Sequence, residues 1–253
     1  MSKTFLNISK IECLNIYQEI VENSNSHFQI SELAANDSKF GIAISHLILS
    51  SEELVKGIII FLDGNGLQIR KATGVKKFFT NHEVRHTFSV MFLAVSTVLI
   101  PITILIKNFK ESDDPSLFKK MQNANSNNDQ TQVKKLTVKL LTKFASENFE
   151  KLSDYFDFWN DAEILKQKGF YVDYKNKLLL PKHLTNEDYM NAKQITEKFI
   201  DDGKKFIAYI NSLNAYDKKY FINLINNDKQ IYSMFEKFSP KKQLPITAVW
   251  RNS

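Results

Sequence analysis

Long segments in which apolar residues recur with the period of an α-helix dominate this sequence, and few helix-breaking residues interrupt them. The 253 residues include only 7 glycines and 5 prolines, whereas Phe, Ile, Leu and Lys are plentiful. Because Gly and Pro are the residues that helix interiors tolerate least, this pattern predicts a mainly helical chain. A chain of this length can bury a full hydrophobic core.

Four such segments precede residue 169 and are expected over about residues 8–24, 31–62, 75–106 and 132–168. The turn sequence DGNG at 63–66 ends the second segment. The fourth carries the cleanest apolar stripe, which includes Trp159. Four long helices joined by short polar connections favour an antiparallel bundle. The exception is the Asn-, Asp- and Ser-rich stretch 110–131, which is expected to form a mobile loop.

Residues 169–181, GFYVDYKNKLLLP, break the helical pattern and predict a short β-hairpin, because β-branched and aromatic residues flank a Lys-Asn-Lys turn. Thr185 and Asp188 then form a capping-box pattern, which predicts a helix that runs to about Leu213. The expected fold is therefore all-α in the main. It comprises an antiparallel helical bundle over 1–168, with the hairpin and additional C-terminal helices of 169–253 packed on the same domain.

Charge and cysteine content restrict the partners only loosely. The net charge of +6 is a mild bias towards polyanions such as RNA. The single cysteine, Cys13, excludes an intramolecular disulfide and a cysteine-rich metal site. The N-terminal sequence has no basic-then-apolar leader, so a cytoplasmic location is expected.

The apolar run Phe88–Ile106 has two interpretations. Its uncharged residues would just span a bilayer core of roughly 30 Å. A central helix surrounded by partners in a bundle is also apolar all round. Since the run directly follows a polar cluster on the same expected helix, a buried core helix is favoured. A membrane-anchored protein stays as an alternative.

The second segment carries the polar group SEELVKG, in which Glu52 and Glu53 lie four and three residues before Lys56. Both pairs can meet on a helix surface. Taken alone, such pairs are most simply solvated salt bridges.

In the third segment, His82, Arg85 and His86 share one helical face, because residues three and four apart lie within about 60° of each other. If the second and third segments pack antiparallel, this group can meet the acidic one. Two histidines four residues apart also suit zinc, but no third ligand is identifiable. No metal and no cofactor are therefore expected.

Together the two groups could cleave RNA without a metal. His82 would act as general acid–base, since the pKa of histidine lies near neutrality. Arg85 and Lys56 would stabilise charge on the phosphate in the transition state. Glu52 or Glu53 would orient the histidine and raise its pKa.

Three stretches in this order resemble the AbiV family of abortive-infection proteins, which is related to the HEPN superfamily of helical bundles. They are SSEELVKG at 50–57, His82 with a basic residue three positions later, and LKQKGFYVDYKNKLLLP at 165–181. The resemblance implies a bacterial anti-phage role. It also implies a HEPN-like bundle that forms homodimers, as many HEPN relatives are dimeric, metal-independent ribonucleases.

Two classes of function stay open, because the typical HEPN motif, an Arg followed four to six residues later by His, is absent after Arg85. In the first, the chain acts on RNA or the translation machinery as a ribonuclease. In the second, it is a non-catalytic protein that binds a phage or host protein. Ser45 and His86 are candidate supporting residues of the site. Tyr171 and Asp173 are candidates too, although a role in pinning the hairpin to the bundle is favoured.

Overall fold

The structure is a computed structural model. Four long helices make up most of the part of the chain that it describes. The predicted apolar helix at 88–106, the greater part of the predicted loop at 110–131, and the segment beyond 222 lie outside the described residues. The residues that the structure describes are 3–71, 73–79, 85, 120, 123–124, 127, 129, 131–132, 135, 149–175, 177–215, 218–219 and 222.

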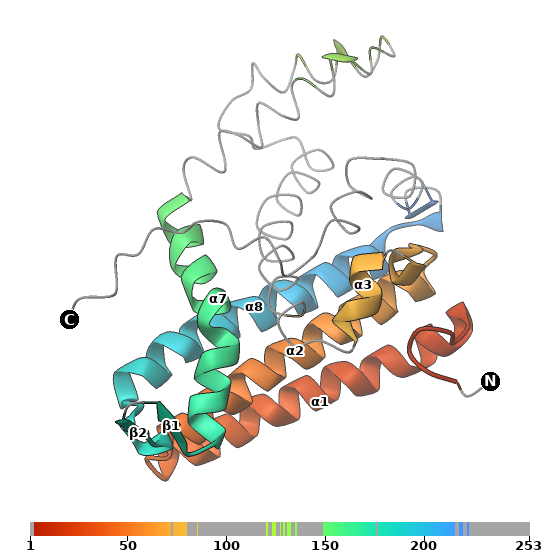
Figure 1. Cartoon of the computed structure of the whole chain (residues 1–253). Coiled ribbons are helices and arrows are strands. Elements are labelled where there is room, and N and C mark those ends of the chain that lie inside the picture. Colours follow the sequence, from red (N-terminus) through yellow and green to blue (C-terminus); the bar gives the residue numbers. More distant parts are fainter. Residues whose placement is uncertain are drawn as a thin grey trace.

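The first two helices, α1 (Lys10–Asn36) and α2 (Phe40–Gly64), form an antiparallel hairpin (Figure 1). A capping box between Ser9 and Glu12 starts α1. The sequence-based end of this helix near residue 24 was wrong, because no glycine or proline interrupts the chain before Asn36. The reversal instead occurs at Ser38, whose φ of 58° is the left-handed conformation that closes many helix ends.

Small residues let α1 and α2 approach closely. Ser50, Gly57 and Gly64 recur every seven residues along α2 and face α1. The Ser50 hydroxyl donates to the Ser24 backbone carbonyl over 2.8 Å. A Cβ at Gly57 would lie 2.9 Å from a methyl group of Val21. The seam therefore fixes the register of the two helices.

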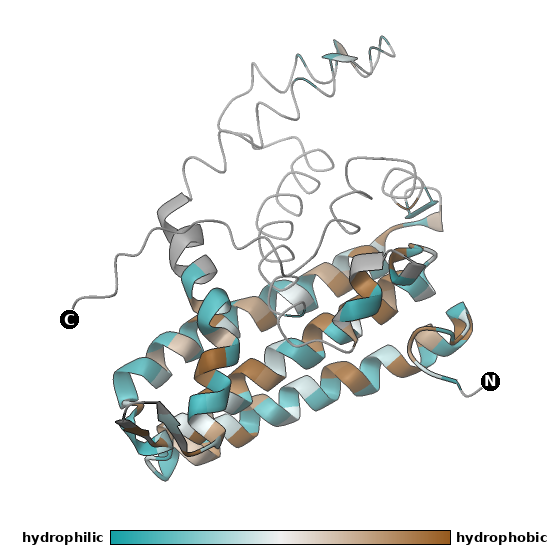
Figure 2. Cartoon of the chain, in the orientation of Figure 1, coloured by the Kyte–Doolittle hydropathy of each residue, from teal (hydrophilic) through white to brown (hydrophobic). Residues whose placement is uncertain are grey.

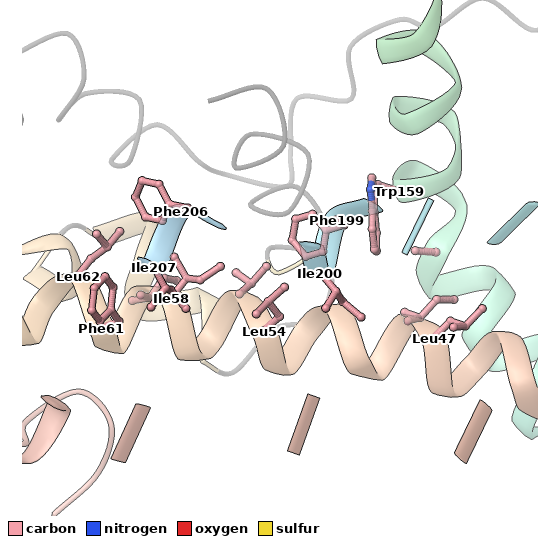
Figure 3. Packing of buried hydrophobic residues seen from close by; sticks show 14 of the residues in the cluster. Leu47, Leu54, Ile58, Phe61, Leu62, Trp159, Phe199, Ile200, Phe206 and Ile207 are labelled. Carbon is pink, nitrogen blue, oxygen red and sulfur yellow. The ribbon is translucent and has the colours of Figure 1, made fainter. Parts of the chain in front are cut away.

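Helix α2 is the centre of the molecule, since α1, α7 (Phe149–Phe170) and α8 (Asn186–Ser212) all pack on it (Figure 1). Most of its residues are buried, as the interior position demands, and Figure 2 shows apolar segments along its whole length, with hydrophilic ones between them. Figure 3 shows the core where α2 meets α7 and α8. The labelled side chains are Leu47, Leu54, Ile58, Phe61 and Leu62 of α2, Trp159 of α7, and Phe199, Ile200, Phe206 and Ile207 of α8.

The antiparallel arrangement predicted for the bundle holds for α1 and α2, and α8, one of the expected C-terminal helices, runs parallel to α2. The rings of Phe40 and Tyr189, near the start of each helix, lie 6.2 Å apart. Further along, a Cβ at Gly203 would meet Leu54 and Ile58. The reason is that α7 ends beside the start of α2, so the segment after α7 delivers α8 to that same end.

Between α7 and α8 lie two short strands, β1 (Asp173–Lys175) and β2 (Lys177–Leu179), which pair antiparallel with Tyr174 opposite Leu178. They fall within the segment for which the sequence predicts a hairpin. A 3₁₀ turn, η2 (Pro181–His183), follows. The predicted capping box is confirmed: the Asp188 backbone N–H donates to the Thr185 hydroxyl, and α8 ends one residue before Leu213.

The predicted end of α2 at the DGNG turn is also confirmed, with Gly66 at φ 103°. Beyond it come η1 (Ile69–Lys71) and α3 (Thr73–Phe78). Within the described ranges, none of the helices is both long and apolar enough to span a bilayer.

Candidate functional site

A buried carboxylate lies where α2 faces α7. The side chain of Glu52 is only 1% exposed. One of its oxygens accepts a hydrogen bond from Arg85 Nη1 at 2.9 Å, and the other accepts one from Lys166 Nζ at 2.7 Å. The Lys166 ammonium also lies 2.7 Å from a carboxylate oxygen of Glu163. We call these four residues the Glu52 network.

Charges are balanced in the Glu52 network, which has two carboxylates and two cations. Transfer of a charge out of water costs several kcal/mol unless partners replace the water. Here each oxygen of Glu52 has a cationic donor, and Arg85 donates in addition to the Phe79 carbonyl at 3.4 Å. Glu52 is therefore suited to holding Arg85 and Lys166 in place rather than to accepting a proton from a substrate.

The sequence places Lys166 in this site through the spacing of α7. Trp159, Ala162, Lys166 and Gly169 follow at intervals of three, four and three, and all four are buried. This stripe faces α2. A lysine on an otherwise apolar stripe was the signal that could have identified Lys166, which sequence reasoning missed.

Ser45 joins the two helices beside the network. Its buried hydroxyl lies 2.9 Å from the backbone carbonyl of Lys166 and 3.0 Å from that of Gly41. The hydroxyl proton can serve one of these acceptors at a time. Ser45 is therefore placed as a contact between α2 and α7.

Glu53 and Lys56 form an ion pair on the neighbouring face of α2. Their side chains are 17% and 15% exposed, so water reaches both. The Lys56 ammonium also lies 5.9 Å from the centre of the Phe5 ring. The two adjacent glutamates thus have different surroundings. Glu52 is buried between helices, whereas the side chain of Glu53 is partly exposed on the neighbouring face of α2.

The half-buried face of α2 that carries Glu53 also carries His46, one of a pair of histidines that sequence reasoning did not single out. His46, Leu49, Glu53 and Lys56 follow at helical spacing on α2 and are all half-buried. His46 Nδ1 lies 3.1 Å from Nδ1 of His27 on α1. Since 19 residues separate these histidines, only the register of α1 on α2 could have revealed the contact.

Burial lowers the pKa of both His27 and His46. The proximity of His27 lowers the pKa of His46 further, while Glu53 and Glu52 oppose the shift of His27. Neutral rings fit the geometry, because one Nδ1–H can then donate to the unprotonated Nδ1 opposite.

His82 and His86 lie outside the described residues. Tyr171, after the end of α7, is 60% exposed. Asp173 lies in β1 opposite Leu179. Among the described residues, no three His, Cys, Asp or Glu side chains gather where they could hold a metal ion.

Comparison with known proteins gives one match. The model of the HEPN-type family described as AbiV matches residues 12–201. That range contains α1 from its third residue, all of α2 and α7, both strands, and α8 as far as Asp201. No curated protein and no solved structure matches the sequence.

Proposed function

Because this chain belongs to the HEPN-type AbiV family, we propose that it is a bacterial anti-phage effector that acts by abortive infection. The family model spans the whole arrangement in which α1, α7 and α8 surround α2. Membership therefore supports this role for the described core as a unit. The proposal includes a cytoplasmic location and a homodimer. Sedimentation of the purified chain would measure the mass of the dimer.

Within this role, the proposed activity is cleavage of RNA without a metal. His82 takes the proton from a ribose 2′-OH, whose oxygen then attacks the adjacent phosphorus. The bond from phosphorus to the 5′-oxygen breaks, and that oxygen receives the proton back from His82, which becomes neutral again. The products are a 2′,3′-cyclic phosphate and a 5′-hydroxyl. Arg85 and Lys56 balance the charge on the phosphate oxygens during the step.

The observation that carries this proposal is the bond between Glu52 and Arg85. Arg85 follows His82 by three residues in the chain. A buried carboxylate therefore holds Arg85, which is three residues along the chain from the proposed general acid–base. Lys56 is one helical turn from Glu52, and its partly exposed side chain lies on the neighbouring face of α2, where a phosphate could approach from solvent.

The test is a cleavage assay on end-labelled cellular RNA in the presence of EDTA. Wild type is expected to release discrete products that end in 2′,3′-cyclic phosphate, and His82→Ala is expected to leave the RNA intact. His183→Ala changes an exposed histidine of η2 and should cleave like wild type. Intact RNA with wild type, repeated in extract from phage-infected cells to supply a trigger, would contradict the ribonuclease proposal.

A non-catalytic interaction protein is the second candidate, and the burial of the Glu52 network favours it. Arg85 and Lys166 are 12% and 5% exposed, and both bond to a carboxylate of the chain itself. In this case the polar residues keep the helices in register, and a bundle face binds a phage or host protein. His82→Ala would then lower stability by about 1–3 kcal/mol if it strands buried partners. A melting curve of that variant separates the two candidates.

A further inference from the structure

The segment that joins α7 to α8 is fixed to α2 at both of its ends. A Cβ at Gly169 would lie only 2.1 Å from the Gly41 carbonyl oxygen and from the Ser45 hydroxyl. At the other end, a Cβ at Gly41 would lie 2.6 Å from the Pro181 carbonyl oxygen. Both ends thus meet α2 at Gly41, and such close contacts hold the intervening hairpin in a defined place.

The middle of this segment exposes its large side chains instead of burying them. Exposed fractions are 60% for Tyr171, 62% for Val172, 72% for Tyr174 and 48% for Leu178. With Phe170, they make five of the fourteen exposed large apolar residues of the described chain, within nine positions. Tyr174 and Leu178 lie opposite each other across the two strands, and exposed apolar side chains that gather in this way mark an interaction site. We call Tyr171, Val172, Tyr174 and Leu178 the hairpin platform.

Ring contacts connect the hairpin platform to the helices. The Phe170 ring lies 5.5 Å from that of His46 in an edge-on arrangement and 6.3 Å from that of Tyr171. The position of Tyr171 is therefore supported from α2. A ring held in this way loses little conformational freedom when a ligand stacks on it.

The surroundings of the platform are basic. Residues 168–183 contain four lysines and one aspartate, a balance of +3 with His183 neutral. Lys168 and Lys182 are exposed, and neither has an ion-pair partner among the described residues. Accessible tyrosine rings in a stretch of chain that also carries exposed lysines suit a polyanion with planar bases better than an apolar protein surface.

We propose that the hairpin platform binds single-stranded RNA, with bases stacked on Tyr171 and Tyr174 and phosphates near Lys168 and Lys182. A single strand is required because bases paired in a duplex are not free to stack on side chains. This inference deepens the proposed function and rests on RNA as the target. Glu52 follows Gly41 by eleven positions along α2. At about 1.5 Å per residue, the distance is about 16 Å, or roughly five stacked nucleotides at about 3.4 Å each.

The test measures binding of a fluorescent single-stranded 2′-O-methyl RNA, which cannot be cleaved through its 2′-oxygen, to the full chain. Stacking contributes about 1–3 kcal/mol per base, so Tyr171→Ala with Tyr174→Ala should weaken binding at least about tenfold. Tyr171→Phe with Tyr174→Phe keeps both rings and should stay within about twofold of wild type. Ile11→Ala, which removes a 72% exposed side chain at the far end of α1, should bind like wild type.

A second measurement addresses the lysines. Lys168→Gln with Lys182→Gln should reduce the dependence of log Kd on log salt by about 1.4, since each neutralised phosphate contributes about 0.7 for a single strand. An unchanged salt dependence would remove the lysines from the site.

Equal affinity of wild type and the double alanine variant would overturn the inference, as would a wild type that binds no single-stranded RNA. Capture of a phage protein through the two tyrosines, with RNA affinity unchanged, would also overturn it. Failure of the ribonuclease proposal gives a different result: wild type binds RNA through the platform but does not cleave it. All these substitutions are at exposed positions, and matching melting temperatures would verify that each variant folds.

Discussion

Two adjacent glutamates show how far the role of a residue depends on its position on the helix. Glu52 and Glu53 have the same chemistry, but only Glu52 points between α2 and α7, where its side chain is 1% exposed. We expect Glu52→Gln to lower the free energy of unfolding by about 3–5 kcal/mol, because it removes the buried negative charge that faces both Arg85 and Lys166, although Lys166 retains Glu163. Urea denaturation followed by circular dichroism would measure the loss.

The matched control is Glu53→Gln, which changes the same group one position away. Its partner, Lys56, can be solvated instead, so the expected cost is below about 1 kcal/mol. Equal losses in the two variants would mean that the Glu52 network does not have the energetic role that its burial indicates.

The pair His27–His46 predicts a dependence of stability on pH. Burial lowers the pKa of both rings in the folded chain below the ordinary value of about 6.5. Between the lowered and the ordinary pKa, the unfolded chain binds more protons than the folded one, so stability rises with pH. The contribution is complete above about pH 6.5 and is lost as the pH falls below it. Each histidine contributes less than about 1.4 kcal/mol per pH unit, because solvent screens these half-buried rings.

Urea unfolding at a series of pH values would measure this slope. In a variant with His27→Gln and His46→Gln, the part of the slope near pH 6 should disappear, while the part due to carboxylates at lower pH should persist. A slope near pH 6 that is the same in the double variant would show that other groups cause it.

At the residue scale, the sequence predicted which residue types form the candidate site better than it predicted their partners. Glu52 and Arg85 were placed together as a possible contact, and they bond to each other. Lys166 and His27 were missed, because their contacts depend on where α1 and α7 cross α2. Helical periodicity within one segment contains no information about that crossing.

At the scale of elements, the close approach of α7 to α2 at Gly169 is the contact most sensitive to one added carbon. We expect Gly169→Ala to lower the free energy of unfolding by about 1–3 kcal/mol or more, because the new Cβ would overlap the backbone carbonyl of Gly41, which cannot rotate away. The same substitution at Gly203 meets the flexible end of Leu54 instead. There the gain of about 1 kcal/mol in helix propensity from Gly to Ala should offset the contact. Urea titrations of both variants provide the comparison, and equal costs would contradict it.

Helix ends were predictable where side chains cap the backbone and were not predictable elsewhere. Thr185 with Asp188 identified the start of α8, because a capping box satisfies N–H groups in a fixed pattern. The end of α1 at Asn36 has no such signature, since it depends on a serine in the left-handed conformation. Alternation of residue types also could not show that the hairpin would expose its tyrosines. Their exposure depends on where the hairpin is held, and this is set by the contacts of Gly169 and Pro181 with Gly41.

At the scale of the whole molecule, the sequence predicted a helical bundle with C-terminal helices packed on it, but not the direction in which those C-terminal helices run. Antiparallel order is the simplest solution when each helix follows the last through a short connection. Here α7 and the hairpin intervene between α2 and α8 and return the chain to the start of α2. The parallel contact of α2 with α8 therefore buries residues from both sides of position 168 in one cluster that includes Leu54, Trp159 and Phe199.

This shared cluster predicts that residues 1–168 and 169–253 do not unfold separately. Helix α8 covers Leu54 and Ile58 of α2, so loss of α8 would expose the centre of the core. In a Trp250→Phe background, fluorescence reports Trp159 alone, which is 1% exposed and contacts Phe199 of α8. Its transition in urea should coincide with loss of amide protection in peptides from α1 and from α8, as expected for one cooperative unit. If peptides from α8 lose protection at lower urea than those from α1, the two parts are separate folding units, and the contact between α2 and α8 contributes little to the stability of the remainder.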